Sequence, residues 1–230
     1  SRRIPSPFIS SPTVFAHRLW ARAPDRDARS KPSGEREQKM TRIRLYQDVH
    51  FGGRELATDE SIENMQTYDF NDAVSSCIVD SGIWLLYQHA HFQGEVSLLT
   101  TGNYGSPNAM GISNDILSSV RKLPEPSGPT ICLFEDSHFR GRMVVLRGAH
   151  SNLKMLNFND KMSSAIVLNG SWAAYEHVDF RGKTWRLETA RGVGDMLSDG
   201  SSGFADMAKL GVYPTPSPFD NDTVSSLKPL

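Results

Sequence analysis

The six residues Asn71-Asp72-Ala73-Val74-Ser75-Ser76 form a pattern, Asn-Asp-x-x-Ser-Ser, that occurs four times in this chain of 230 residues. The other three copies span residues 114–119, 159–164 and 221–226. Each copy follows an aromatic-x4-Phe-x-Gly signature, and the four signatures begin at Tyr46, Tyr87, Phe134 and Tyr175. A signature that recurs at a regular interval indicates a repeated supersecondary unit.

The spacing of the repeats groups them into two pairs. Intervals of 41, 47 and 41 residues separate the signature glycines, which are Gly53, Gly94, Gly141 and Gly182. The longer middle interval contains residues 124–129, whose Pro-rich composition is typical of a linker. A unit of about 40 residues is too small to bury a core alone, so we expect two repeats to pack together.

The local pattern favours β-structure. Short runs of strand-forming residues, such as 143–146 and 165–168, alternate with turn-forming Gly, Asn, Asp and Ser. The Phe-x-Gly step predicts a hairpin whose glycine adopts a positive φ. No long amphipathic helix is evident. The sequence therefore predicts an all-β protein with one β-sandwich domain over 40–123, a linker over 124–129 and a second domain over 130–230.

From about Thr41 to Leu230, the paired motifs resemble those of the βγ-crystallin superfamily, in its calcium-binding branch. The resemblance implies two Greek-key motifs per domain, which form two four-stranded sheets packed face to face. It also implies two calcium ions per domain, bound crosswise. One motif supplies the Asp of its Asn-Asp pair and the carbonyl just after its first aromatic residue. The other supplies the first Ser hydroxyl and the carbonyl just after its own Asp.

The resemblance implies four ligand sets, which we number as sites one to four. Site one combines Asp72 and the Gln47 carbonyl with Ser118 and the Ile116 carbonyl. Site two combines Asp115 and the Gln88 carbonyl with Ser75 and the Ala73 carbonyl. Site three combines Asp160 and the Glu135 carbonyl with Ser225 and the Thr223 carbonyl. Site four combines Asp222 and the Glu176 carbonyl with Ser163 and the Lys161 carbonyl. One ligating carboxylate per site indicates modest affinity, with water in the remaining positions.

Other interpretations of these residues are weaker. A single Asn-Asp-x-x-Ser-Ser is typical of a simple turn, but four copies in register favour calcium. No copy lies in a Gly-x-Ser-x-Gly elbow, so we expect no enzyme. We expect Trp84 and Trp172 to be core residues. We expect exposed hairpin tips rather than a zinc site for the histidines of the first hairpins, which are His50, His89, His91, His138 and His177.

Charge and composition limit the remaining classes of function. The formal net charge is −1. Residues 1–39 hold 9 Lys and Arg against 4 Asp and Glu, whereas the rest holds 16 against 22. This acidic body disfavours nucleic acid as a partner and suits cations. No apolar run approaches the length of about 18 residues that a membrane span needs. Cys77 and Cys132 fall in different predicted domains, so we expect no disulfide. Neither compartment nor oligomeric state is indicated.

Two segments lie outside the repeat pattern. Residues 1–39 predict a disordered extension, either a targeting segment or an untranslated or vector-derived piece ahead of a start at Met40. The fourth repeat carries an insertion at about 188–218, with a short helix expected over 204–210. The sequence thus predicts a non-enzymatic calcium-binding protein with a structural, stress-related or calcium-storage role. The alternative is a module that recognises carbohydrate or a partner protein through this insertion.

Overall fold

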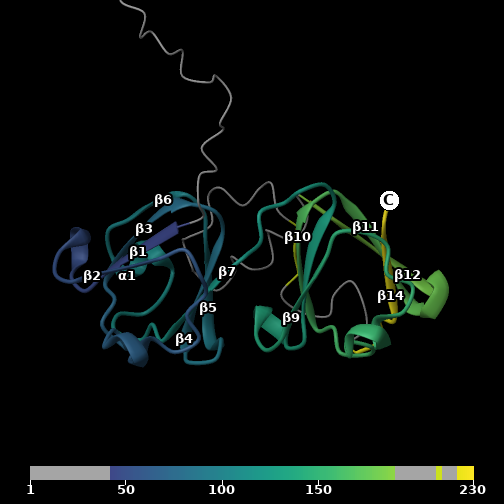
Figure 1. Cartoon of the computed structure of the whole chain (residues 1–230), viewed down its shortest axis with the longest axis horizontal. Helices are drawn as coiled ribbons and strands as arrows, with labels where there is room; N and C mark the ends of the chain where they lie inside the picture. The colour runs from purple at the N-terminus through teal and green to yellow at the C-terminus, as the bar shows by residue number, and fades with distance from the viewer. Residues whose placement is uncertain (1–41, 190–210, 214–221) are drawn as a thin grey trace, which may run out of the picture. The chain divides into compact units, whose positions relative to one another are not determined.

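The structure is a computed structural model that describes residues 42–189, 211–213 and 222–230. The predicted extension over 1–39 and most of the insertion over 188–218, with its expected helix, lie outside the described residues. Residues 39–230 belong to one compact unit. Short antiparallel strands dominate the described part of this unit, as predicted (Figure 1).

The first two repeats form seven strands and three short helices. The strands are β1 (Arg42–Tyr46), β2 (Glu55–Thr58), β3 (Ser76–Ser81), β4 (Trp84–His89), β5 (Gln93–Leu99), β6 (Gly102–Tyr104) and β7 (Ser119–Lys122). The helices are the 3-10 turns η1 (Val49–Phe51) and η2 (Met65–Tyr68) and the single α-helical turn α1 (Pro107–Met110). One sheet has the order β2-β1-β3-β6, and the other has the order β5-β4-β7.

The last two repeats reproduce this arrangement. Their described strands are β8 (Thr130–Phe134), β9 (Met143–Leu146), β10 (Ser164–Asn169), β11 (Ser171–His177), β12 (Arg181–Glu188), β13 (Gly211–Tyr213) and β14 (Ser226–Pro229). Their described 3-10 turns are η3 (Ser137–Phe139), η4 (Leu153–Leu156) and η5 (Val178–Phe180). The sheets have the orders β13-β10-β8-β9 and β12-β11-β14. Figure 1 shows β14, in yellow, beside β11, with which it pairs in antiparallel register.

The repeats are paired by exchange of a strand. The short strand β6 belongs to the second repeat but pairs with β3 of the first, and β13 of the fourth repeat pairs with β10 of the third. The first and third repeats contribute only a single β-bridge each to the sheet of their partner repeat. These bridges join Ile62 with Val120 and His150 with Leu227. One sheet of each domain therefore has three strands plus one bridge, not the four strands that we expected. Backbone bonds to Ile62 run both ways with Val120, so this bridge holds the segment at the sheet edge.

A separate apolar core fills each pair of repeats. Trp84 is fully buried in the first core and Trp172 in the second. Their indole N–H groups donate to the carbonyls of Ser81 and Asn169 at 3.2 and 3.4 Å. The prediction that both tryptophans are core residues is confirmed. Each contributes a large apolar surface and satisfies its single polar atom locally.

The hairpin after each first aromatic residue has a constrained backbone. The signature glycines have φ between 70° and 83°, which confirms the predicted positive φ. A Cβ built at Gly141 would lie 2.6 Å from a carboxylate oxygen of Asp136, so a side chain there would clash as well as strain the backbone. The two aromatic residues of each signature contact one another, with ring centroids 5.5 to 5.8 Å apart. The signature therefore encodes a folded hairpin closed by an aromatic pair.

A third buried cluster joins the second repeat to the third. It contains Leu85, Tyr87 and Leu98 from one and Phe134, Ile166 and Leu168 from the other. The Tyr87 hydroxyl donates to the Phe139 carbonyl at 2.6 Å, and Arg121 Nη2 donates to the Gly141 carbonyl at 2.7 Å. The Arg121 guanidinium lies 3.8 Å from the Phe92 ring centroid. Burial raises the pKa of Tyr87 and lowers the pKa of Arg121.

Candidate metal sites

The Asp of each Asn-Asp pair lies in an exposed, tightly turned backbone. Asp72, Asp115, Asp160 and Asp222 are exposed and have φ between 51° and 54°. Asp and Asn tolerate this left-handed conformation better than other side chains that carry a Cβ. The Asn71 amide donates to Asp72 Oδ2 at 2.6 Å, and the next two copies, Asn114 with Asp115 and Asn159 with Asp160, make the same bond. In these three loops Oδ2 of the carboxylate is held by the neighbouring Asn, and Oδ1 is left to make contacts outside the Asn-Asp pair.

The first serine of each pair is placed by the strand that follows the loop. Ser75, Ser118, Ser163 and Ser225 are 6 to 8% exposed. Their backbone N–H groups donate, at 2.9 to 3.0 Å, to the carbonyl of the first aromatic residue of their own repeat. Since that bond orients the backbone, each hydroxyl is held at the base of a loop and not free on the surface.

Each acid meets the serine of the partner repeat. Asp72 Oδ1 accepts from the Ser118 hydroxyl at 3.0 Å, and Asp115 Oδ1 lies 3.4 Å from the Ser75 hydroxyl. In the second domain Asp160 pairs with Ser225 at 3.2 Å and Asp222 with Ser163 at 3.3 Å. The residues joined are 40 to 65 positions apart in sequence. All four pairs cross between repeats, as the ligand sets of sites one to four require.

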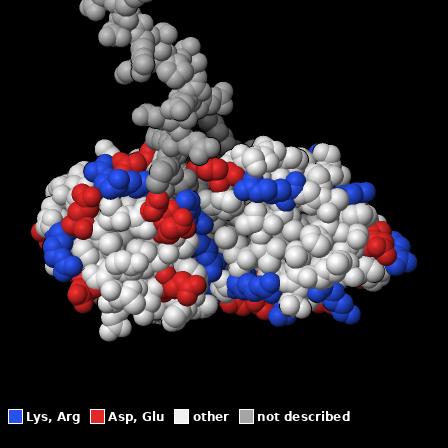
Figure 2. All heavy atoms as spheres, viewed as in Figure 1, with Lys and Arg blue, Asp and Glu red and all other residues white. Residues whose placement is uncertain are grey.

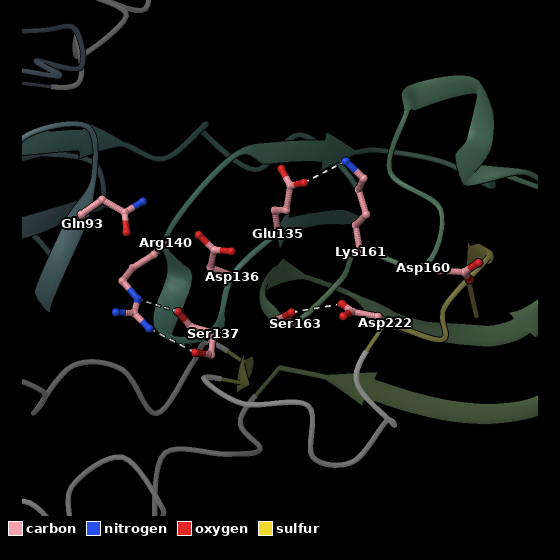
Figure 3. A pocket seen from close by; sticks show the side chains of 9 residues that line it. All are labelled: Gln93, Glu135, Asp136, Ser137, Arg140, Asp160, Lys161, Ser163 and Asp222. Atoms are coloured by element: carbon pink, nitrogen blue, oxygen red, sulfur yellow. Dashed lines mark hydrogen bonds and ion pairs between the residues drawn. The ribbon is translucent and has the colours of Figure 1, made fainter.

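The predicted ligand residues fall into two groups: those that line a pocket beside the loops, and those that do not. The first-domain pocket, of about 410 Å³, is lined by Asp72, Gln88, Asp115, Ile116 and Ser118, among others. The Ile116 carbonyl lies 3.5 Å from the Ser118 hydroxyl. The pocket beside the second-domain loops, of about 550 Å³, includes Glu135, Asp160, Lys161, Ser163 and Asp222 in its lining (Figure 3). Predicted residues outside both linings are Gln47, Ala73, Ser75, Glu176, Thr223 and Ser225.

The second serine of each pair has a different role, which our sequence analysis did not identify. Ser76, Ser119, Ser164 and Ser226 are fully buried. The Ser76 hydroxyl donates to the Asp48 carbonyl at 2.6 Å and accepts from the Phe51 N–H at 3.0 Å. The other three make the same two bonds within 0.1 Å. This serine fastens the hairpin of its repeat to the strand that begins at the loop. Its recurrence directly after the first serine of each pair is the only signal in the sequence.

The donor set consists of oxygen atoms. Carboxylate, hydroxyl and carbonyl oxygens are the ligands of hard cations such as calcium. Within the described ranges, no group of three or more His, Cys, Asp or Glu side chains converges as a transition-metal site would require. All five histidines of the first hairpins are exposed, as predicted. Both cysteines are free and buried.

The surface view shows acidic and basic side chains interspersed on the face drawn in Figure 2. No helix within the described residues is both long and apolar enough to cross a membrane.

Three features define a two-domain, all-β protein of repeated structure. They are the paired Greek-key motifs, the hairpins held by buried serines, and the Asp–Ser contacts between partner repeats. A profile described as Beta/Gamma crystallin matches residues 42–123 and 130–200. The chain therefore belongs to the βγ-crystallin family, whose members are non-enzymatic structural proteins.

Several relatives support this assignment. Human Gamma-crystallin D is 34% identical over 150 residues, which cover 64% of this chain and 84% of that protein. A Beta/gamma-crystallin of Ciona intestinalis is 41% identical over 83 residues, 36% of this chain and 99% of that protein. Human Beta/gamma crystallin domain-containing protein 1 is 31% identical over 155 residues, 66% of this chain but only 7% of that longer protein.

A solved structure agrees with the fold. Geodin, a beta-gamma crystallin from Geodia cydonium, superimposes with a TM-score of 0.58, and the match covers 83% of this chain and 99% of geodin. Its sequence identity of 16% is too low to support more than a shared fold.

Proposed function

We propose that this chain is a calcium-binding βγ-crystallin-type protein with a structural, stress-related or calcium-storage role, and that its ions bind crosswise at sites one to four. The observation that carries the proposal is the set of four Asp–Ser contacts between partner repeats. Each contact brings a carboxylate oxygen to 3.0 to 3.4 Å from a hydroxyl oxygen.

These separations suit a shared calcium ion. Two neighbouring oxygens, each about 2.4 Å from one ion in a pentagonal bipyramid, lie roughly 2.8 to 3.4 Å apart. The Asp–Ser oxygens therefore need little movement to coordinate together, with the hydroxyl hydrogen turned away from the metal. Since the acids are exposed, carbonyls and water can complete the coordination.

The role of the ion would be to lock the two repeats of a domain together. Each proposed site takes ligands from both repeats, so it exists only when they are folded against one another. A ligand that binds only the folded state adds about 2.7 kcal/mol per site at 100 times its dissociation constant. The melting temperature of the full chain should therefore rise with calcium and fall with chelator. An identical melt in both conditions would refute the proposal.

Crosswise coordination has a sharper test in the first domain. Asp72→Ala should remove one ion, because a single carboxylate supplies most of the ligand charge of site one. Adding Ser118→Ala should cost little more, since both residues act on the same ion. Adding Ser75→Ala or Asp115→Ala should instead damage site two as well. Calorimetric stoichiometry of the full chain distinguishes these cases.

The matched control is Asp69→Ala, which removes another exposed acid with positive φ from the loop just before the pattern. It should leave the stoichiometry unchanged. Coupling of Asp72 with Ser75 rather than with Ser118 would mean that each ion is bound within one repeat. The alternative function, recognition of carbohydrate or protein, depends on the 188–218 insertion, most of which lies outside the described residues.

A further inference from the structure

A lysine lies at the edge of the pocket beside the loops of proposed sites three and four. Lys161 Nζ donates to Glu135 Oε1 at 2.9 Å, and the pocket around this ion pair is also lined by Asp160, Ser163 and Asp222 (Figure 3). Lys161 and Glu135 are 47% and 32% exposed in their side chains, so water reaches both. The ion pair thus links a residue from each of sites three and four at their solvent-facing edge.

This cation is specific to one repeat. The residue directly after the Asp of each pattern is Ala73, Ile116, Lys161 or Thr223, so only the third repeat places a positive charge there. The pocket's other basic residue, Arg140, donates to the backbone carbonyl and hydroxyl of Ser137 at 3.0 and 3.2 Å, within its own hairpin. Of the two basic side chains in this lining, Lys161 is therefore the one that pairs with an acidic side chain of the lining.

Its partner also differs between repeats. The residue after the first aromatic is Gln47 or Gln88 in the first domain and Glu135 or Glu176 in the second. Gln88 and Glu176 accept bonds from the backbone of their own hairpins, at Glu95 and Lys183. Glu135 instead pairs with Lys161. The second domain thus carries two extra acids near its sites, and the charge of one is offset by the lysine.

We infer that Lys161 is a tethered counter-cation that lowers the calcium affinity of the second domain, and that Glu135 limits this effect by holding the ammonium. The inference rests on the proposed calcium function. An incoming divalent ion is repelled by the ammonium at the pocket edge. In a water-like dielectric, a unit charge and a divalent ion that are roughly 8 Å apart repel one another by about 1 kcal/mol, which corresponds to about a five- to tenfold loss of affinity. Salt should screen it, because the Debye length is about 10 Å at 0.1 M ionic strength.

The test uses the full chain with Asp72→Ala and Asp115→Ala, which confines calcium binding to sites three and four. In this background Lys161→Gln should raise calcium affinity about five- to tenfold at low salt, and the gain should shrink toward about twofold near 0.5 M salt. Lys161→Arg should retain the low affinity. Glu135→Gln should lower affinity, because the ammonium loses its partner. Isothermal calorimetry with calcium chloride measures each value.

Lys154→Gln is the matched control, since Lys154 is an exposed lysine of the same domain that does not line this pocket. It should change affinity by less than about twofold. A second readout is stability: Lys161→Gln should enlarge the increase in melting temperature that calcium produces. Equal calcium affinities with and without the Lys161→Gln substitution, or a gain that persists in high salt, would overturn the inference. If the parent chain binds no calcium, the proposed function fails together with it.

Discussion

Two adjacent serines in each repeat have different structural roles. Ser75 lies at the base of a loop and contacts Asp115 of the partner repeat, whereas Ser76 bonds within its own repeat. The difference follows from where the strand begins, because β3 starts at Ser76. Ser76 joins a carbonyl and an N–H that the hairpin leaves without a ladder partner. A buried hydroxyl that both donates and accepts is hard to replace, because its loss leaves two backbone groups without a hydrogen-bond partner.

Ser76→Ala should therefore destabilise the protein even without calcium. Two backbone groups, the Asp48 carbonyl and the Phe51 N–H, lose their bond to this hydroxyl, which should lower the free energy of unfolding by about 1–3 kcal/mol. Urea denaturation followed by fluorescence measures this change. Ser113→Ala, at an exposed serine of the same domain, should change it by less than about 0.5 kcal/mol. Equal effects of the two substitutions would show that the Ser76 hydroxyl does not fasten the hairpin.

The outer faces of equivalent strands explain which repeats pack together. Cys132 and Leu168, on strands β8 and β10, are buried in the cluster between the second and third repeats. The equivalent positions of β1 and β3 hold Arg44 and Asp80, whose side chains pair at 2.7 Å. On the other side, Arg121 of β7 is buried, while the equivalent Lys228 of β14 is only partly buried. At these described positions the third repeat thus presents apolar side chains and the second a buried arginine, whereas the first and fourth repeats present more exposed polar side chains.

Arg121→Ala should destabilise the chain by about 2–4 kcal/mol, because it removes buried packing between rings as well as the bond to Gly141. Lys228→Ala is the matched control in the fourth repeat. Lys228 lies over Tyr175 and Phe180 at 5.4 and 5.1 Å, but it is partly exposed, so its loss should cost less than about 1 kcal/mol. Differential scanning calorimetry measures both. A cost for Arg121→Ala as small as that for Lys228→Ala would argue against a cohesive contact between the second and third repeats.

The two cysteines lie in different buried clusters, so their reactivity can be used to monitor different parts of the molecule. Cys77 lies in the core of the first domain, and Cys132 lies in the cluster between the second and third repeats. Burial raises the pKa of both thiols, that of Cys132 to about 12 from an ordinary value of 9.0. Because the thiolate is the reactive form, neither should react with a thiol reagent in the folded protein near pH 8. Cys132 should react first if the second and third repeats separate before the first domain unfolds.

Alkaline pH should destabilise the fold through these thiols. Their pKa is higher in the folded than in the unfolded state, so their contribution to stability is complete below about pH 9. It is then lost as pH rises toward the folded value of about 12 for Cys132. The free energy of unfolding should fall by about 1.4 kcal/mol per pH unit for each thiol. From about pH 9 to about pH 11, Cys132→Ala should remove the contribution of one thiol to the fall in the free energy of unfolding. Urea unfolding measures this slope. An unchanged slope would contradict the assignment to Cys132.

Local chemistry explains what could be predicted from the sequence. The strands, the glycine hairpins and the two-by-two grouping of repeats follow from turn residues and spacing, which are local properties of the chain. The identity of the loop acids and serines follows equally from the repeated pattern. Residues such as Asp72 and Ser118 were matched only through the family resemblance, because spacing alone does not say that they meet.

Contacts between distant residues required the tertiary structure. The fastening role of Ser76, the bridge at Ile62 in place of a strand, and the pairing of Lys161 with Glu135 join segments 25 to 58 residues apart. The packing of the second repeat on the third is of the same kind, since Tyr87 bonds to Phe139 across 52 residues. Turn chemistry and periodicity act over a few residues, whereas these contacts depend on how sheets stack. The repeat pattern therefore specifies the motifs, and the packing of their faces specifies which motifs meet.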